Sequence, residues 1–301
     1  MGRVAPGVVA GVSRGLPEAM RRAVLITGAG GLVGSTLCRR VPEGVTVEGT
    51  VRSRPAPDGT RSHRIDLAQP GAFLDLVARR RPSLVIHTAY DPRDHQHGIV
   101  DATIEVASAC AALEIPLIHF STDAVFDGEH APYGEDDVPE PVHAYGRAKR
   151  LAEVAVGDSG GDVAIVRTSI VVSDVPLDGT SEWVVTALRA GERVTLFGDE
   201  IRTPILVDDL ADATWEIASL EPAARSGIWH LRGPEALSRV DIGMWLCRRF
   251  DLDPSLIDVR SSAVEGAGRP RDLSLTGARA ATLSVRPRPL STVTGHGQTH
   301  R

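Results

Sequence analysis

Residues 27–34 read Thr-Gly-Ala-Gly-Gly-Leu-Val-Gly and join an apolar run at residues 23–27 to a segment with helical spacing at residues 32–41. Glycines at three-residue spacing between a strand and a helix allow a tight turn and the close approach of a pyrophosphate. The N–H groups at the start of the helix then bind the anion. The stretch predicts a dinucleotide-binding turn, with a purely structural turn as the alternative. The residues expected to line it are Gly28, Gly30, Gly31, Leu32, Val33 and Gly34.

The alternation of apolar runs and helical spacing continues along the first half of the chain. Further strands are expected at residues 45–51, 84–88, 117–121 and 163–168, and further helices at 72–80, 99–113 and 148–156. This order predicts an α/β fold of the Rossmann type, a doubly wound parallel sheet with helices on both faces. After residue 170 the pattern is less regular, with helices expected at 183–189, 210–220 and 242–250 and a strand at 229–231.

These patterns divide the chain into four parts. Residues 23–170 are the predicted nucleotide-binding domain. Residues 171–285 are mainly a smaller substrate-binding part, some elements of which return to the first domain. Residues 1–22 lack a compact apolar segment and are expected to be a disordered leader, and the polar residues 286–301 a flexible tail. Within the smaller part, Ser238 is the expected cap of a helix.

Composition and charge narrow the class of protein. The 301 residues carry 33 Lys and Arg against 39 Asp and Glu, a net charge of −6 without a basic block, so nucleic acid is not an expected partner. Cys38, Cys110 and Cys247 form no C-x-x-C pair, which is typical of the reducing cytoplasm. No apolar run approaches the length of about 18 residues that a membrane helix needs, so no membrane association is expected.

The predicted second strand ends in Arg52-Ser53-Arg54. An acidic side chain at this place would bind the ribose 2′-hydroxyl of NAD(H), whereas a basic one suits the 2′-phosphate of NADP(H). NADP(H) is therefore the expected cofactor in preference to NAD(H), with Arg52 as the first candidate and Arg54 as the second. Two exposed loop arginines without a ligand are the alternative. Asp66 and Leu67, after a third strand, are expected to flank the adenine.

Tyr145 and Lys149 are four residues apart, so on a helix they lie on one face. Reduction of a ketone generates an alkoxide that needs a proton, and tyrosine is a slow donor unless a cation stabilises its phenolate. Lys149 can supply that charge. Thr122 follows a buried strand, where its hydroxyl could bind the carbonyl oxygen of a substrate. A solvated helix face and an ordinary turn residue are the alternatives.

A metal site is not expected. One loop carries Asp91, Asp94, His95 and His97, but nothing in the sequence fixes the ligand geometry that a specific metal requires. A solvated loop is the simpler interpretation.

Three motifs together resemble the extended short-chain dehydrogenase/reductase superfamily, and within it the dTDP-4-dehydrorhamnose reductases. They are the glycine-rich start at residues 27–34, Ser-Thr-Asp-Ala-Val-Phe-Asp-Gly at residues 121–128, and Tyr-Gly-Arg-Ala-Lys at residues 145–149. Further matches occur at residues 167–169, 202–211, 227–231, 238–239 and 269–273. The likeness thus covers most of the chain beyond residue 22.

The resemblance implies a Rossmann-like domain for NADP(H) and a smaller C-terminal part for a nucleotide sugar. It assigns proton donation to Tyr145, and to Lys149 the orientation of the nicotinamide ribose and the tuning of Tyr145. Thr122 would bind the carbonyl oxygen, with Asp123 beside it at the substrate. Further implied cofactor contacts are Thr88, Ala89 and Tyr90. Arg202 and Arg269 match positions that contact the substrate diphosphate, with surface ion pairs as the alternative; the resemblance leaves a homodimer open.

Three functions follow from the resemblance. The first is NADPH-dependent reduction of a nucleoside-diphosphate 4-keto-6-deoxysugar, and the second is epimerisation of a nucleotide sugar. The third is a non-catalytic, NADP-binding regulatory subunit similar to the β-subunit of methionine adenosyltransferase. Ala124 stands where sugar-nucleotide dehydratases carry a glutamate, which argues against dehydration, and Ile99 replaces the usual relay asparagine.

Overall fold

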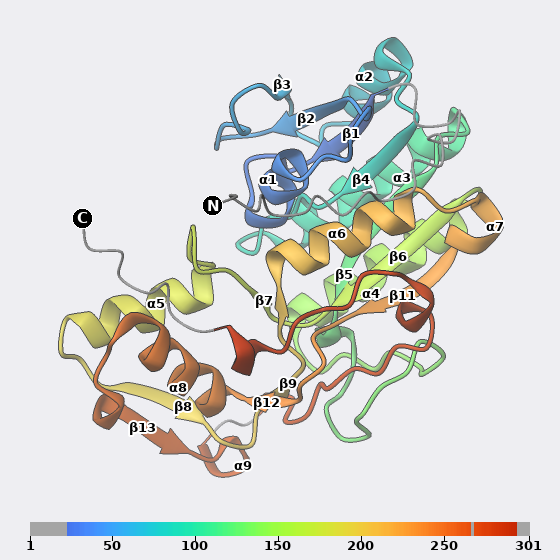
Figure 1. Cartoon of the computed structure of the whole chain (residues 1–301). Coiled ribbons are helices and arrows are strands. Elements are labelled where there is room, and N and C mark those ends of the chain that lie inside the picture. Colours follow the sequence, from blue (N-terminus) through green and yellow to red (C-terminus); the bar gives the residue numbers. More distant parts are fainter. Residues whose placement is uncertain (1–22, 266–267, 294–301) are drawn as a thin grey trace, which may run out of the picture.

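The central sheet contains seven parallel strands. The computed structural model describes residues 23–265 and 268–293, so the predicted leader at residues 1–22 lies outside the described part. The strands are β1 (Val24–Thr27), β2 (Val47–Val51), β3 (Arg61–Arg64), β4 (Leu84–His87), β5 (Leu117–Thr122), β6 (Val163–Thr168) and β11 (Gly227–Leu231). Their spatial order is β11-β6-β5-β4-β1-β2-β3 (Figure 1). The chain adds strands toward one edge from β1 to β3 and toward the opposite edge from β4 onward, so the strand order reverses between β1 and β4. Ligands of open parallel sheets bind at such a reversal.

Helices cover both faces of this sheet. One face carries α1 (Leu32–Arg39) and α6 (Val207–Ala218), and the other carries α2 (Ala72–Arg80), α3 (Ala102–Ala112) and α4 (Ala144–Asp158). Along β1, Val24 and Ile26 belong to the first apolar cluster and Leu25 to the second, because successive side chains point to opposite faces. The predicted doubly wound α/β fold is confirmed.

The helix predicted at residues 99–113 begins earlier in the structure. A π-helical segment, η2 (Gln96–Asp101), leads directly into α3. Residues 96–98 lack apolar spacing, so periodicity could not reveal this first turn. The segment places its Ile99 and Val100 against Ala148 and Ala152 of α4.

The C-terminal part has its own apolar core. Four elements enclose it: α5 (Gly179–Arg189), β8 (Val194–Phe197), α8 (Arg239–Phe250) and β13 (Ile257–Arg260). Ser238 caps α8 as predicted, since its hydroxyl accepts the N–H of Asp241 at 3.0 Å and the Asp241 carboxylate accepts the N–H of Ser238 at 2.8 Å. The remaining short elements are β7 (Val171–Val172), β9 (Ile201–Arg202), β10 (Ile205–Leu206), β12 (Leu237–Ser238), α7 (Pro222–Arg225), α9 (Ser262–Glu265) and the 3-10 turns η3 (Asp123–Val125), η4 (Pro254–Leu256), η5 (Ala280–Thr282) and η6 (Leu290–Thr292).

Later segments return to the central sheet. β11 extends the sheet beside β6, and α6 packs on α1, where Trp215 donates its indole N–H to the carbonyl of Leu37 at 3.2 Å. In the predicted tail, Leu290 is buried in the C-terminal core, and residues 294–301 lie outside the described part. Within residues 23–265 and 268–293, no helix is both long and apolar enough to span a bilayer.

Candidate active site

The glycine-rich turn lies between β1 and α1, as predicted. Gly31 caps α1 without a side-chain hydrogen bond, and the first turn contains no acidic residue. The N–H groups of that turn, including those of Leu32 and Val33, therefore suit an anion. Gly28 has a φ of +70°, and a Cβ there would lie 2.8 Å from the Cα of Ala89, so a larger residue would separate the turn from the segment after β4.

The segments after β2 and β4 flank this turn. A Cβ on Gly30 would overlap the backbone of Arg54, so the chain after β2 covers the turn closely. Thr88, after β4, donates its hydroxyl to the carbonyl of Thr27 at 2.7 Å. The turn and both flanking segments thus offer a nicotinamide dinucleotide a fitting site, with backbone donors for the pyrophosphate at one end of α1.

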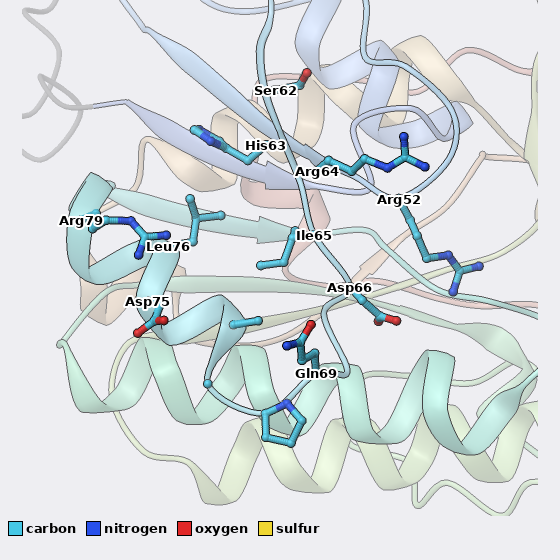
Figure 2. Close-up of a pocket in the computed structure, with 13 residues that line it drawn as sticks. Arg52, Ser62, His63, Arg64, Ile65, Asp66, Gln69, Asp75, Leu76 and Arg79 are labelled. Atoms are coloured by element: carbon cyan, nitrogen blue, oxygen red, sulfur yellow. The ribbon is translucent and has the colours of Figure 1, made fainter.

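A polar cavity of about 900 Å³ opens between β3 and α2. Arg52, Arg64 and Asp66 line it, and Figure 2 shows their side chains extending to the same side of the β3 segment. Asp66 and Arg52 thus line the same cavity. Leu67 instead packs into the apolar core under α2 and α3. The sequence did not reveal that Arg52 forms an ion pair with Asp91, at 2.5 Å.

Tyr145 and Lys149 share one face of α4, as their spacing predicted. Lys149 is buried and donates its ammonium to the carbonyl of Phe120 at 2.6 Å. Burial lowers the pKa of Lys149 to about 8, and the nearby Glu153 carboxylate opposes that shift. Burial raises the pKa of Tyr145 above its ordinary value, whereas its hydrogen bond with Thr122 acts in the opposite direction. Tyr145 is thus a protonated phenol next to the Thr122 hydroxyl.

Gly146 explains how α4 reaches the end of β5. A Cβ at this position would overlap the carbonyl oxygen of Ala124, so only glycine permits the observed approach. That approach brings Tyr145 to Thr122. The ring of Tyr90, from the segment after β4, lies 6.3 Å from the Tyr145 ring and 5.9 Å from the Lys149 ammonium.

A buried ion pair anchors this helix, and sequence reasoning missed it. Glu153 lies one turn beyond Lys149 and accepts two hydrogen bonds from the Arg167 guanidinium, each at 2.9 Å. Ser121 donates its hydroxyl to the same carboxylate at 2.5 Å. The spacing of Tyr145, Lys149 and Glu153 at every fourth residue was the available signal.

Asp123, directly after Thr122, is buried. Burial raises its pKa, while the charge of Arg202 and a hydrogen bond from Ser169 at 2.7 Å act against that shift. Arg202 itself donates to the backbone carbonyls of Ile201 at 2.7 Å, of Arg271 at 3.0 Å and of Pro270 at 3.2 Å. Arg202 therefore joins β9 to the segment at residues 270–271 through hydrogen bonds.

A second cavity, of about 200 Å³, lies in the C-terminal part. Arg239 and Arg269 both line it, and both contact the buried Glu200, at 3.5 Å and 2.5 Å. Arg269 also lies 5.1 Å above the ring of Phe197. Arg269 thus lies in the wall of a cavity, and Arg202 does not line this cavity. Arg239 begins α8. Residues 238–239 belong to the stretches that resemble the family, but sequence reasoning assigned no role to Arg239.

The protein-family model described as the RmlD substrate binding domain matches residues 20–292. The chain belongs to the RmlD substrate-binding domain family. A relative in Haloferax volcanii, named "Probable low-salt glycan biosynthesis reductase Agl14", is 34% identical over 265 residues, which are 82% of this chain and 87% of that protein. Methionine adenosyltransferase 2 subunit beta of Bos taurus is 28% identical over 285 residues, 88% of this chain and 83% of that protein.

Solved structures similar to this RmlD-family chain share its whole fold. A hypothetical dTDP-4-dehydrorhamnose reductase from Sulfolobus tokodaii is 28% identical with a TM-score of 0.76, and 89% of this chain and 98% of that chain are covered. MoeE5 in complex with UDP-glucuronic acid and NAD is 25% identical with a TM-score of 0.76, covering 90% of this chain and 97% of that chain. The predicted kinship with dTDP-4-dehydrorhamnose reductases is confirmed.

Proposed function

We propose that this protein is an NADPH-dependent reductase of a nucleoside-diphosphate 4-keto-6-deoxysugar. The observation that carries the proposal is the meeting of Tyr145, Lys149 and Thr122 at the carboxyl end of β5. A proton donor, a cation and a hydroxyl are what the reduction of a carbonyl needs. The reductase named in Haloferax volcanii, which shares most of its length with this chain, supports the class of reaction.

The glycine-rich turn and the start of α1 would hold NADPH, which would supply a hydride for the carbonyl carbon. Thr122 donates its hydroxyl to the carbonyl oxygen and polarises the bond. Tyr145 then gives its phenolic proton to the developing alkoxide, which is general acid catalysis. The Lys149 ammonium stabilises the phenolate that remains, and the burial of Lys149 strengthens this charge interaction.

The protonation state of Lys149 sets the expected pH profile. Its pKa is about 8, so the ammonium is present at pH 7 and is lost as the pH rises through this value. We expect kcat/KM for reduction to fall above pH 8, by about tenfold for each further pH unit, because the phenolate loses its cation. Steady-state kinetics with NADPH between pH 6 and pH 10 measure this limb. A flat profile up to pH 10 would contradict the role of Lys149.

The second cavity supports a nucleotide-sugar substrate. Two arginines that line one cavity offer planar donor pairs to phosphate oxygens. MoeE5, whose structure holds a UDP-sugar, shares the fold along the whole of its chain. A diphosphate at Arg269 would be remote from the reacting carbonyl and would be held similarly in the ground state and the transition state.

Arg269→Ala is therefore expected to raise the substrate KM by about tenfold or more while kcat changes little. Steady-state kinetics with a keto-sugar nucleotide measure both constants. Arg271→Ala is the matched control, because Arg271 pairs with the exposed Glu129 and does not line the cavity. Equal effects of the two substitutions, or a loss confined to kcat, would contradict a diphosphate contact.

A substrate screen tests the proposal as a whole. Oxidation of NADPH, followed by its absorbance, is compared between a panel of nucleoside-diphosphate 4-keto sugars and simple ketones of similar size. We expect turnover with at least one sugar nucleotide and much less with the simple ketones. Equal activity on both classes would refute the substrate assignment, and its absence on every carbonyl would refute the reductase.

A regulatory role is the second candidate. The observation that favours it is the similarity to methionine adenosyltransferase 2 subunit beta over most of the chain. Under this proposal the protein binds NADP(H) without reducing any carbonyl, and it acts by changing the activity of a partner enzyme. Tyr145 and Lys149 would then be dispensable, so Tyr145→Phe and the wild type would be indistinguishable in partner binding. The placement of Tyr145 and Lys149 on one helix beside the end of β5 favours the reductase.

A further inference from the structure

Asp91, in the segment after β4, binds two arginines from different parts of the chain. Arg52 lies 2.5 Å from one carboxylate oxygen, and Arg93 donates to both oxygens, at 3.0 Å and 3.1 Å. Asp91 is only 8% exposed. Hydrogen bonds from the guanidinium groups of Arg93 and Arg52 hold its pKa well below the ordinary value. Asp91 is therefore a carboxylate at every pH at which the protein would work.

The backbone fixes the position of Asp91. Its N–H donates to the carbonyl of Gly98 in η2 at 3.1 Å. Gly98 approaches so closely that a Cβ on this glycine would overlap the Cβ of Asp91. Arg52 has a side chain that is 48% exposed, so it is the member of the pair that can move. A ligand that needs Arg52 must draw its guanidinium away from a stationary carboxylate.

Arg52 also borders the large polar cavity. Val51 pairs with Arg64 across β2 and β3, so both arginines leave the same end of the sheet (Figure 2). Within residues 23–265 and 268–293, Asp91 is the only side chain that forms a hydrogen bond with Arg52. A phosphate entering the cavity would compete with that carboxylate for one guanidinium and would meet its negative charge.

We propose that Asp91 is a specificity-determining residue that limits the preference of this protein for NADP(H) over NAD(H). This inference rests on the proposed function, since it presumes that the large cavity beside Arg52 receives the adenosine end of a nicotinamide dinucleotide. The 2′-phosphate is the group that distinguishes the two cofactors, and Arg52 is the candidate to bind it. Asp91 holds that arginine and repels the phosphate. Arg93 offsets part of the repulsion by neutralising Asp91.

The experiment measures dissociation constants for NADPH and NADH by quenching of tryptophan fluorescence, which requires no turnover. Asp91→Asn keeps the size of the side chain and removes its charge. We expect NADPH to bind about tenfold more tightly to this variant while NADH binding changes little. In an Arg52→Ala background the same substitution should change the ratio of the two constants by much less, because its effect acts on Arg52.

Two further variants sharpen the test. Asp94→Asn removes the same charge from the same loop. The Asp94 carboxylate accepts the N–H of His97 and is not paired with Arg52, so the ratio of the two dissociation constants should stay at the wild-type value. Arg93→Ala removes one of the two positive charges beside Asp91, so it should weaken the binding of NADPH relative to that of NADH. Arg93 is 82% exposed, so this variant keeps the fold even if Asp91→Asn does not.

Each outcome bears on one of the two proposals. An unchanged ratio in Asp91→Asn and Arg93→Ala, with wild-type binding of both dinucleotides, would overturn the role of Asp91 and leave the reductase intact. A fall in the NADPH preference of Asp91→Asn would show that Asp91 orients Arg52 for the phosphate, which also overturns the proposal. Failure of the wild type to bind either dinucleotide would overturn the proposed function, and this inference with it.

Discussion

Tyr145→Phe is expected to lower the reduction of a keto-sugar nucleotide by about 100- to 10,000-fold, because the substitution removes the general acid. Binding of NADPH should stay close to the wild-type value. The phenyl ring keeps its packing against the apolar cluster of Ile99, Val100 and Ala152, so the site keeps its shape. Single-turnover kinetics and a fluorescence titration of NADPH measure the two quantities separately.

Lys149→Met provides the contrast to this variant. It should weaken both turnover and NADPH binding, since the ammonium is expected to contact the nicotinamide ribose as well as to stabilise the Tyr145 phenolate. Turnover of Tyr145→Phe within a factor of about ten of the wild type would show that the proton comes from another donor. The catalytic assignment would then be wrong, although the fold and the cofactor site would stand.

Glu153→Ala is expected to lower the free energy of unfolding by about 3–5 kcal/mol, because it leaves the charge of Arg167 buried without its partner. The side chains of Glu153 and Arg167 are each 1% exposed, so water cannot replace the carboxylate without rearrangement of the core. Ser121 loses its acceptor as well. Urea denaturation, followed by circular dichroism, measures the difference between the variant and the wild type.

Asp258→Ala is the matched control. Asp258 pairs with Arg193 on the surface, where both side chains are accessible to solvent, and such pairs contribute about 0–1 kcal/mol. Each substitution removes the carboxylate from a closely paired arginine, and the difference between the two losses reflects the burial of Glu153 together with its additional contacts to Ser121 and Arg150. Similar losses for both variants would show that the core accommodates an unpaired Arg167, and that Glu153 does not anchor α4 to β6.

Local spacing explains why much of the site was predictable. A strand, a glycine-rich turn and a helix are adjacent in the chain, so residues 27–34 specify the anion-binding turn without help from distant residues. Tyr145 and Lys149 meet on one face of α4 because the helical repeat puts every fourth residue on the same side. The doubly wound sheet was predictable because short apolar runs alternate with helical segments along the chain, which is the order of a parallel sheet covered by helices.

Only the tertiary structure decided the ionic partners. Arg52 and Asp91 are 39 positions apart, and they meet because the ends of β2 and β4 lie on either side of β1. Arg239 and Arg269 share a cavity and both contact Glu200, although nothing in the two stretches of sequence that contain them indicates a common partner. Charged side chains carry no periodic signal that reveals a distant partner. The sequence by itself determined the fold, the anion-binding turn and the tyrosine–lysine pair, and packing of the strand ends determined which charges face one another.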